Sequence, residues 1–174
     1  MTSRREAVAL RIGLISDTHG LLRPEALVYL QGCDHIVHAG DIGDPTILER
    51  LRNIAPVTAV RGNNDIGPWA DTLREIEHLT TGGVCLCVVH DRGTLRSADF
   101  GAHTRVVVSG HTHKPAVVRS DSVVYVNPGS AGRRRFSLPI AAGEIVVSSS
   151  GARLRVVDLM AQDKDAALLS IDLG

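Results

Sequence analysis

Short apolar runs alternate with segments of helical periodicity in the first half of the chain, and a polar or glycine-containing turn separates each pair. This order is typical of β-α-β units, whose strands lie parallel because a helix connects them. Pro24 and Pro45 suit the first positions of two helices, and Asp44 suits the cap before the second one. The pattern predicts strands over residues 10–16, 35–38 and 57–60, a helix over residues 24–30 and a second helix from Pro45.

The second half of the chain has a different pattern, in which strands follow one another with only turns between them. Such a succession favours an antiparallel or mixed sheet. The segment from Ala161 onward fits no single pattern, and neither an internal repeat nor a long linker divides the sequence. We therefore expect one α/β domain over residues 1–174. The predicted strands of the second half are residues 74–79, 84–89, 106–108, 116–118, 123–126, 145–147 and 154–157.

Composition limits the classes of function. The 19 basic and 19 acidic side chains give a net charge of zero, and 44% of the residues are hydrophobic, so most of the chain should be folded. The neutral charge and an aromatic content of 3% do not indicate a nucleic-acid partner, which stays an open alternative. No apolar run approaches the roughly 20 residues that cross a bilayer. Because Arg11 also interrupts the first apolar run, we expect a cytoplasmic protein without membrane contact.

Four short polar motifs stand directly after predicted strands, and a single histidine ends a fifth strand. Composition alone predicts about 0.04 occurrences of Gly-His-x-His and about 0.03 of Gly-Asn-x-Asp, so finding both is hard to attribute to chance. Ligands of open α/β sheets bind beyond the carboxyl ends of the strands. We therefore expect these side chains to converge on one crevice. The motifs are Asp17-Thr18-His19, Gly40-Asp41, Gly62-Asn63-Asn64-Asp65 and Gly110-His111-Thr112-His113, and the single histidine is His90.

These residue types suit a metal centre. Neutral imidazoles together with carboxylates bind divalent transition ions, whereas sites made only of oxygen atoms favour Mg²⁺ or Ca²⁺. The candidate ligands exceed what one ion requires, but they suffice for two ions that share a carboxylate. Asp41 is the candidate bridging ligand, since the preceding Gly40 has no side chain to keep backbone, metal and substrate apart. Taken singly, the same residues would fit ordinary turns, helix caps and surface histidines.

In this order the motifs closely resemble the calcineurin-like metallophosphoesterase superfamily, from about Asp17 to His113. The later run Asn127-Pro128-Gly129-Ser130 is similar to a turn in the short, single-domain phosphodiesterase branch. The resemblance implies two packed mixed β-sheets flanked by helices, and two divalent metal ions, with Mn²⁺ favoured over Fe, Ni or Zn. The ligands that it implies are Asp17, His19 and His113 for the first ion, Asn63, His90 and His111 for the second, and Asp41 as the bridge.

Three positions depart from the superfamily's usual pattern. Asn64 stands where the commonest form has a histidine that assists the leaving group, and an amide cannot donate and recover a proton as imidazole does. Pro45 stands where the protein phosphatases carry an arginine, which disfavours that activity. Asp91 follows His90 where glycine is usual. With Asn64 and Asp41 as the expected catalytic residues, we expect a preference for esters whose alcohol leaves easily, such as aryl esters.

The sequence therefore predicts a metal-dependent phosphodiesterase that hydrolyses a small phosphodiester through a hydroxide bridging two metal ions. The alternatives are a nuclease or a phosphomonoesterase on the same site, or a non-catalytic scaffold like the retromer subunit that resembles this superfamily. Asn64 and Arg133 are the candidate substrate contacts, and the run Arg133-Arg134-Arg135 would otherwise be a solvated loop. The pattern does not indicate an oligomeric state.

Overall fold

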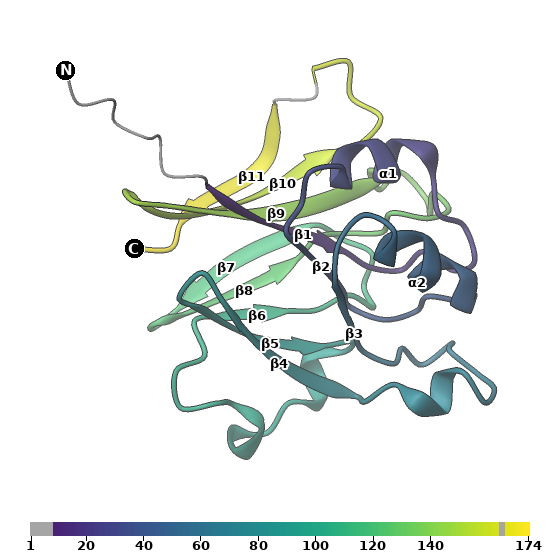
Figure 1. The fold of residues 1–174 in the computed structure, drawn as a ribbon, viewed down its shortest axis with the longest axis horizontal. Helices are drawn as coiled ribbons and strands as arrows, with labels where there is room; N and C mark the ends of the chain where they lie inside the picture. The colour runs from purple at the N-terminus through teal and green to yellow at the C-terminus, as the bar shows by residue number, and fades with distance from the viewer. Residues whose placement is uncertain (1–8, 164–165) are drawn as a thin grey trace.

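Two β-sheets face each other in the computed structural model, which describes residues 9–163 and 166–174 (Figure 1). The strands of the larger sheet are β1 (Leu10–Ile15), β2 (His35–His38), β3 (Val57–Ala59), β9 (Ala141–Ser148), β10 (Gly151–Asp158) and β11 (Ala167–Asp172). Those of the smaller sheet are β4 (Ile76–Thr81), β5 (Val84–Val89), β6 (Val106–Val108), β7 (Ala116–Ser120) and β8 (Val123–Asn127). The strand order is β11-β10-β9-β1-β2-β3 in the larger sheet and β4-β5-β6-β8-β7 in the smaller one.

Each sheet combines parallel and antiparallel strands. β1, β2 and β3 run parallel, as the β-α-β pattern predicts, and so do β5, β6 and β8. The other strand pairs are antiparallel. These pairings confirm the predicted α/β fold of two packed mixed sheets. Because parallel strands end at the same edge of a sheet, the loops that follow them are brought together there.

Both α-helices pack against the outer face of the larger sheet (Figure 1). α1 (Pro24–Leu30) and α2 (Pro45–Arg52) begin at the predicted prolines. The backbone N–H of Thr46 donates to the Asp44 carboxylate at 2.8 Å, so Asp44 caps α2 as expected. Leu30 of α1 and Leu51 of α2 are fully buried in the hydrophobic cluster that includes residues of β1 and β2.

Short 3₁₀ helices, rather than α-helices, lie in the segments that lead into the smaller sheet or connect its strands. They are η1 (Ala70–Thr72), η2 (Arg92–Thr94) and η3 (Ser97–Asp99). Leu95 and Phe100, next to η2 and η3, pack against Cys87 and Val107 on the outer face of this sheet. The helical flanks that the resemblance implies are therefore α-helical on the larger sheet only. No helix among the described residues is long and apolar enough to cross a membrane.

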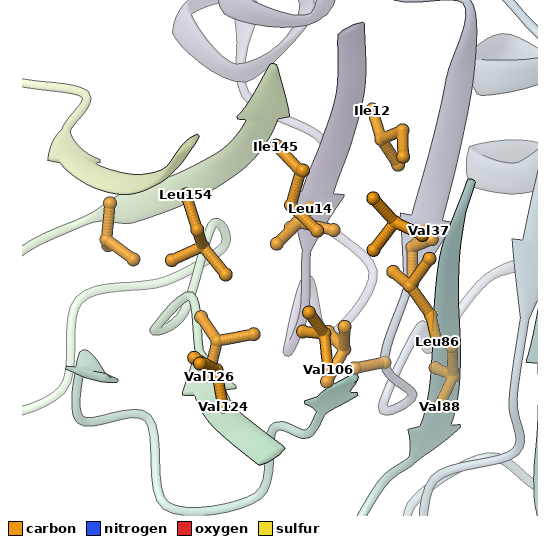
Figure 2. Packing of buried hydrophobic residues seen from close by; sticks show 14 of the residues in the cluster. Ile12, Leu14, Val37, Leu86, Val88, Val106, Val124, Val126, Ile145 and Leu154 are labelled. Carbon is orange, nitrogen blue, oxygen red and sulfur yellow. The ribbon is translucent and has the colours of Figure 1, made fainter. Parts of the chain in front are cut away.

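Aliphatic side chains fill the space between the two sheets. In Figure 2, Ile12, Leu14 and Val37 of the larger sheet face Val88 and Val106 of the smaller sheet, and all five are fully buried. Burying a side chain of this size contributes roughly 1.5–3 kcal/mol. This shared cluster fixes the two sheets relative to each other, which is a precondition for a site built from both. That residues 1–174 form one domain stays a prediction.

Two strands differ most from the expectation. β9 begins at Ala141, four residues before the predicted start at Ile145, and β11 lies in the tail that fitted no pattern. The start of β9 includes Glu144, whose carboxylate is buried because it pairs with Arg11 and Arg155. A buried charge of this kind breaks the apolar run by which a strand is identified in a sequence. β11 could not be identified from the sequence for a different reason. Most of its residues are exposed at the edge of the sheet, so they form no apolar run.

Candidate metal centre

The predicted ligands all lie at one edge of the sandwich, beyond the ends of five strands. The loops after β1, β2 and β3 belong to the larger sheet, and the loops after β5 and β6 belong to the smaller sheet. The crevice therefore lies between the two sheets, and the sequence did not predict which loops belong to which sheet. In chain order the ligands are Asp17 and His19 after β1, Asp41 after β2, Asn63 after β3, His90 after β5, and His111 and His113 after β6.

One group of ligand atoms comes from the loops after β1 and β6. Nε2 of His113 lies 3.4 Å from Oδ1 of Asp17 and 3.2 Å from Nε2 of His19. Nε2 of His19 lies 3.8 Å from the same Asp17 oxygen. One ligand atom from each of these three residues lies within 4.8 Å of the other two, a spacing that suits one metal ion. They are the residues predicted for the first ion.

A second group comes from the loops after β3, β5 and β6. Oδ1 of Asn63 lies 3.0 Å from Nε2 of His90 and 3.1 Å from Nδ1 of His111. Oδ2 of Asp41 lies 3.4 Å from Nε2 of His90 and 3.7 Å from Nε2 of His19, so this carboxylate stands between the two groups. Asp17, Asp41 and His90 are also close enough to share an ion. The geometry fits two ions with a carboxylate between them.

Asp17 provides the clearest indication of a cation. Its side chain is fully buried, and neither carboxylate oxygen accepts a hydrogen bond of good geometry from the described residues, although the side chain of Ser16 and the backbone of His111 lie close enough to offset part of the effect of burial. Burial raises its pKa to about 6. A buried carboxylate without partners costs several kcal/mol unless a cation or a proton compensates its charge. The two imidazoles beside it can supply lone pairs, so the residues present fit a divalent transition ion.

The protonation of the neighbouring groups agrees with this role. Burial, together with the positive charge of Arg135, lowers the pKa of His113 to about 4, so this imidazole is neutral at pH 7. Burial would raise the pKa of Asp41, but the nearby imidazole of His90 and the hydrogen bonds from Asn64 hold that pKa below its usual range. A neutral imidazole and an ionised carboxylate are the forms that bind metals.

The backbone of the site is strained. Seven described residues other than glycine have positive φ angles, and five of the seven are predicted ligands. Such a conformation costs roughly 1–2 kcal/mol per residue and persists where surrounding contacts impose it. Here the N–H groups of two of these residues donate to carbonyls of the loop after β2. The five ligands, with their φ angles, are Asp17 (54°), His19 (47°), Asp41 (53°), His111 (69°) and His113 (60°).

His90 is oriented by the chain beside it. Its Nδ1 lies 2.8 Å from the carbonyl oxygen of Ala39, to which the ring N–H donates, so Nε2 is left to face the site. Metal-binding histidines commonly use the second ring nitrogen in this way. A Cβ atom at Gly40 would lie 2.8 Å from this same Nδ1. The missing side chain of Gly40 therefore makes room for the imidazole of His90.

Asn64 faces Asp41. Its side-chain amide donates to Oδ2 of Asp41 at 2.6 Å, and its backbone N–H donates to Oδ1 at 2.8 Å. Asn64 thus positions the candidate bridging carboxylate, and its contact with a substrate stays a prediction. Asp65 accepts hydrogen bonds from the backbone N–H groups of Gly62 and Gly43, each at 2.8 Å, and so closes its own turn.

Several supporting residues had no signal of their own in the sequence. The side-chain amide of Asn127 donates to the Gly110 carbonyl at 2.7 Å and so holds the loop of His111 and His113. The hydroxyl of Ser130 donates to the Asp17 carbonyl at 2.9 Å. Asn127 and Ser130 belong to the Asn-Pro-Gly-Ser run, which only the family resemblance singled out. Their spacing in the sequence does not indicate which loop they contact.

A cavity of about 340 Å³ adjoins the second group of ligands. Besides Asn63, His90 and His111, the side chains of Ile66 and Asp91 line it. Oδ2 of Asp91 lies 3.9 Å from Nε2 of His111, so the departure at position 91 adds a negative charge at this wall.

On the other side of the site, the arginine run is exposed. Arg133, proposed from the sequence as a substrate contact, has no hydrogen bond or ion pair among the described residues, and that role stays a prediction. Arg135 is the arginine whose charge lowers the pKa of His19 and His113, after the larger effect of burial.

Comparisons with known proteins find phosphoesterases. The family model for the calcineurin-like phosphoesterase superfamily domain matches residues 10–149. A probable metallophosphoesterase of Methanothermobacter thermautotrophicus is 37% identical over 140 residues, which are 74% of this chain and 81% of that protein. A probable metallophosphoesterase of Methanocaldococcus jannaschii is 36% identical over 128 residues, 68% of this chain and 67% of that protein.

Solved structures share the fold. Yfce, a phosphoesterase from E. coli, has a TM-score of 0.71 at 22% identity, covering 95% of this chain and 100% of that chain. Wild-type Vps29 from Entamoeba histolytica, complexed with Zn²⁺, has a TM-score of 0.72 at 18% identity, with the same coverage. At these identities the likeness concerns the fold alone.

Proposed function

This chain belongs to the calcineurin-like phosphoesterase superfamily, and we propose that it hydrolyses phosphodiesters with the help of two divalent metal ions. The observation that carries the proposal is the environment of Asp17. Its buried and unpartnered carboxylate lies beside His19 and His113 and within reach of Asp41 and His90. A purely structural turn has no need for such an arrangement, whereas a metal ion would satisfy it.

The chain's own residues would divide the work. When bound, the two cations lower the pKa of a water molecule and offset the charge of the phosphoryl oxygens. Asp17, His19 and His113 would hold one ion, and Asn63, His90 and His111 the other. Asp41 would join the two, and the hydrogen bonds from Asn64 keep its carboxylate ionised and oriented.

We propose a phosphodiester rather than a monoester on the basis of the residues at the site. Asn64, in place of an imidazole, supplies no proton to a leaving alcohol, so substrates with a good leaving group should react faster. The cavity beside His111 can hold the ester group of a diester that is not cleaved. We further propose Mn²⁺ as the working ion, because mixed imidazole and carboxylate sites accept it. The same ligand types also accept Fe, Ni or Zn.

The test uses the purified protein after metal removal with a chelator. Mn²⁺ is then titrated while p-nitrophenol release is followed from bis(p-nitrophenyl) phosphate and from p-nitrophenyl phosphate. We expect metal-dependent hydrolysis, faster on the diester, which His111→Ala abolishes. His103→Ala is the matched control, since His103 is exposed and precedes β6, at the opposite end of that strand from His111.

Other results would lead to other functions. Faster hydrolysis of the monoester would identify a phosphomonoesterase. A folded protein without hydrolysis under any of Mn²⁺, Zn²⁺, Fe²⁺ or Ni²⁺ would contradict the proposal and favour a non-catalytic scaffold.

A further inference from the structure

The loop between β8 and β9 leaves the sandwich directly beside the candidate metal centre. At its start, the backbone N–H of Ala131 donates to the Ser16 carbonyl at 3.0 Å, and Ser130 bonds to the Asp17 carbonyl. Gly132 packs so closely that a Cβ atom there would lie 2.2 Å from the Thr18 carbonyl oxygen. The base of the loop is thus fixed to the segment that carries Asp17 and His19.

The tip of this loop has an unusual composition for a surface turn. It contains Arg133, Arg134 and Arg135, followed by Phe136, whose surface is 93% exposed. Phe136 also has a φ angle of 52°, a conformation that is costly for a residue with a Cβ atom. The turn is closed by the backbone N–H of Leu138, which donates to the Arg135 carbonyl at 3.1 Å. A fixed turn therefore presents an uncovered aromatic ring.

The charges of the loop are also uncompensated. Among the described residues, no carboxylate forms an ion pair with Arg133, Arg134 or Arg135. Because Ser130, Ala131 and Gly132 at the base of the loop contact the backbone of residues 16–18, the arginines lie on the side of the first group of ligands. The cavity beside His111 lies on the other side of the site and is lined by carboxylates as well as by Arg61. The two sides thus differ in charge.

We propose that Arg135 and Phe136 form a subsite for a nucleoside phosphate, so that the substrate is a phosphodiester with a base and a further phosphate beyond the bond that is cut. This inference rests on the proposed function. An exposed aromatic ring stacks on a nucleobase, and an arginine without a carboxylate partner binds phosphate in a bidentate manner. Arg135 and Phe136 are adjacent on a fixed turn, so they can engage neighbouring parts of one ligand.

Three aryl esters with the same leaving group test the subsite. They are bis(p-nitrophenyl) phosphate, thymidine 5′-(p-nitrophenyl phosphate) and its 3′-phosphorylated form. We expect kcat/KM to rise at each step. Arg135→Ala should lower kcat/KM for the 3′-phosphorylated ester about tenfold, because a hydrogen-bonded ion pair is lost. Phe136→Ala should lower it about tenfold for both nucleoside esters, because stacking is lost. Neither variant should change hydrolysis of the first ester by more than about twofold.

Matched controls separate the subsite from general effects of charge and surface. Arg50→Ala removes an exposed arginine from the last turn of α2, and Val28→Ala removes part of a side chain that is 70% exposed on α1. Both should leave all three rates unchanged. If Arg135→Ala slowed the three esters equally, Arg135 would contact the phosphate that is cut, and the separate subsite would be refuted.

A binding measurement keeps this inference distinct from the proposed function. Calorimetry with thymidine 3′,5′-bisphosphate and the metal-free protein should show binding that Arg135→Ala and Phe136→Ala each weaken about tenfold. Binding without hydrolysis of any ester would overturn the phosphodiesterase but retain the subsite. Hydrolysis of all three esters at equal kcat/KM, with no binding of the bisphosphate, would overturn the subsite but retain the phosphodiesterase.

A nucleoside phosphate could be a free nucleotide or the end of a polynucleotide. A short oligothymidylate carrying the same 5′ aryl ester distinguishes the two. If a polynucleotide is the source, kcat/KM for the oligomer should exceed that of the 3′-phosphorylated nucleoside ester and fall steeply with salt, because several phosphates are then neutralised. If a nucleotide is the source, the two should react alike with a shallow salt dependence.

Discussion

A buried histidine behind the site determines part of the pH dependence of stability. Nε2 of His38 lies 2.9 Å from the hydroxyl of Thr18, and its Nδ1 accepts from the backbone N–H of Gly40 at 3.2 Å. His38 is fully buried and contacts Thr18 and Gly40, the residues beside Asp17 and Asp41, and burial lowers its pKa to about 3.

We predict that His38 destabilises the protein as the pH falls. Its pKa in the unfolded chain is about 6.5, so the folded state binds fewer protons below that pH, and stability is lost progressively between about pH 6.5 and pH 3. In chelator, urea unfolding of the wild type and of His38→Gln should show slopes that differ by about 1.4 kcal/mol per pH unit near pH 5. Parallel slopes would mean that His38 does not titrate on unfolding.

Asn64 allows a direct test of why the site should prefer aryl esters. Replacing it by histidine introduces a group that can give a proton to a leaving alcohol, while the backbone N–H that holds Asp41 remains. We predict that Asn64→His raises hydrolysis of an alkyl diester about a hundredfold, the lower range of general acid catalysis. Hydrolysis of the aryl diester should change little. Asn53→His, at the end of α2, is the control. An unchanged ratio of alkyl to aryl rates would argue against this role.

At the scale of elements, the strands that lead to the site were the easiest to predict. β5 and β6 are continuous apolar runs, and β1 ends in one, because they are buried on both faces between a sheet and a covering layer. The loops that hold the ligands could be placed because they follow such runs. The assignment of each strand to one of the two sheets could not be predicted, since the pairing of β9 with β1 depends on contacts between distant parts of the chain.

The Asn-Pro-Gly-Ser turn after β8 is predicted to maintain the metal centre through the loop after β6. Besides Gly110, the amide of Asn127 reaches the hydroxyl of Thr112 at 3.0 Å. We predict that Asn127→Ala weakens Mn²⁺ binding by about tenfold, the lower range for residues that orient metal ligands. Calorimetric titration measures the affinity, with Asn53→Ala as a control. A loss of stability without a change in affinity would assign Asn127 to folding alone.

For the whole molecule, the ligand types were predictable but their geometry was not. The order of the motifs predicts which residues meet, because the ends of parallel strands converge. The left-handed backbone of residues such as Asp17 and His113 carries no sequence signature, since aspartate and histidine also occupy ordinary conformations. The burial of Asp17 has no sequence signature either, because it depends on both sheets.

The position of the site predicts that metal binding stabilises the entire fold. The ligands come from loops of both sheets, so a bound ion links the larger sheet to the smaller one in addition to the aliphatic core. A ligand at about 100 times its Kd stabilises the folded state by about 2.7 kcal/mol, or about 8 °C in Tm for a chain of this size. Thermal unfolding in Mn²⁺ and in chelator should show this difference.

Two variants test whether the ion links the sheets. His19→Ala removes a ligand from the larger sheet, and His111→Ala removes one from the smaller sheet. Each should reduce the shift in Tm, and the double variant should abolish it. An equal shift in the double variant would place the bound ion elsewhere on the protein.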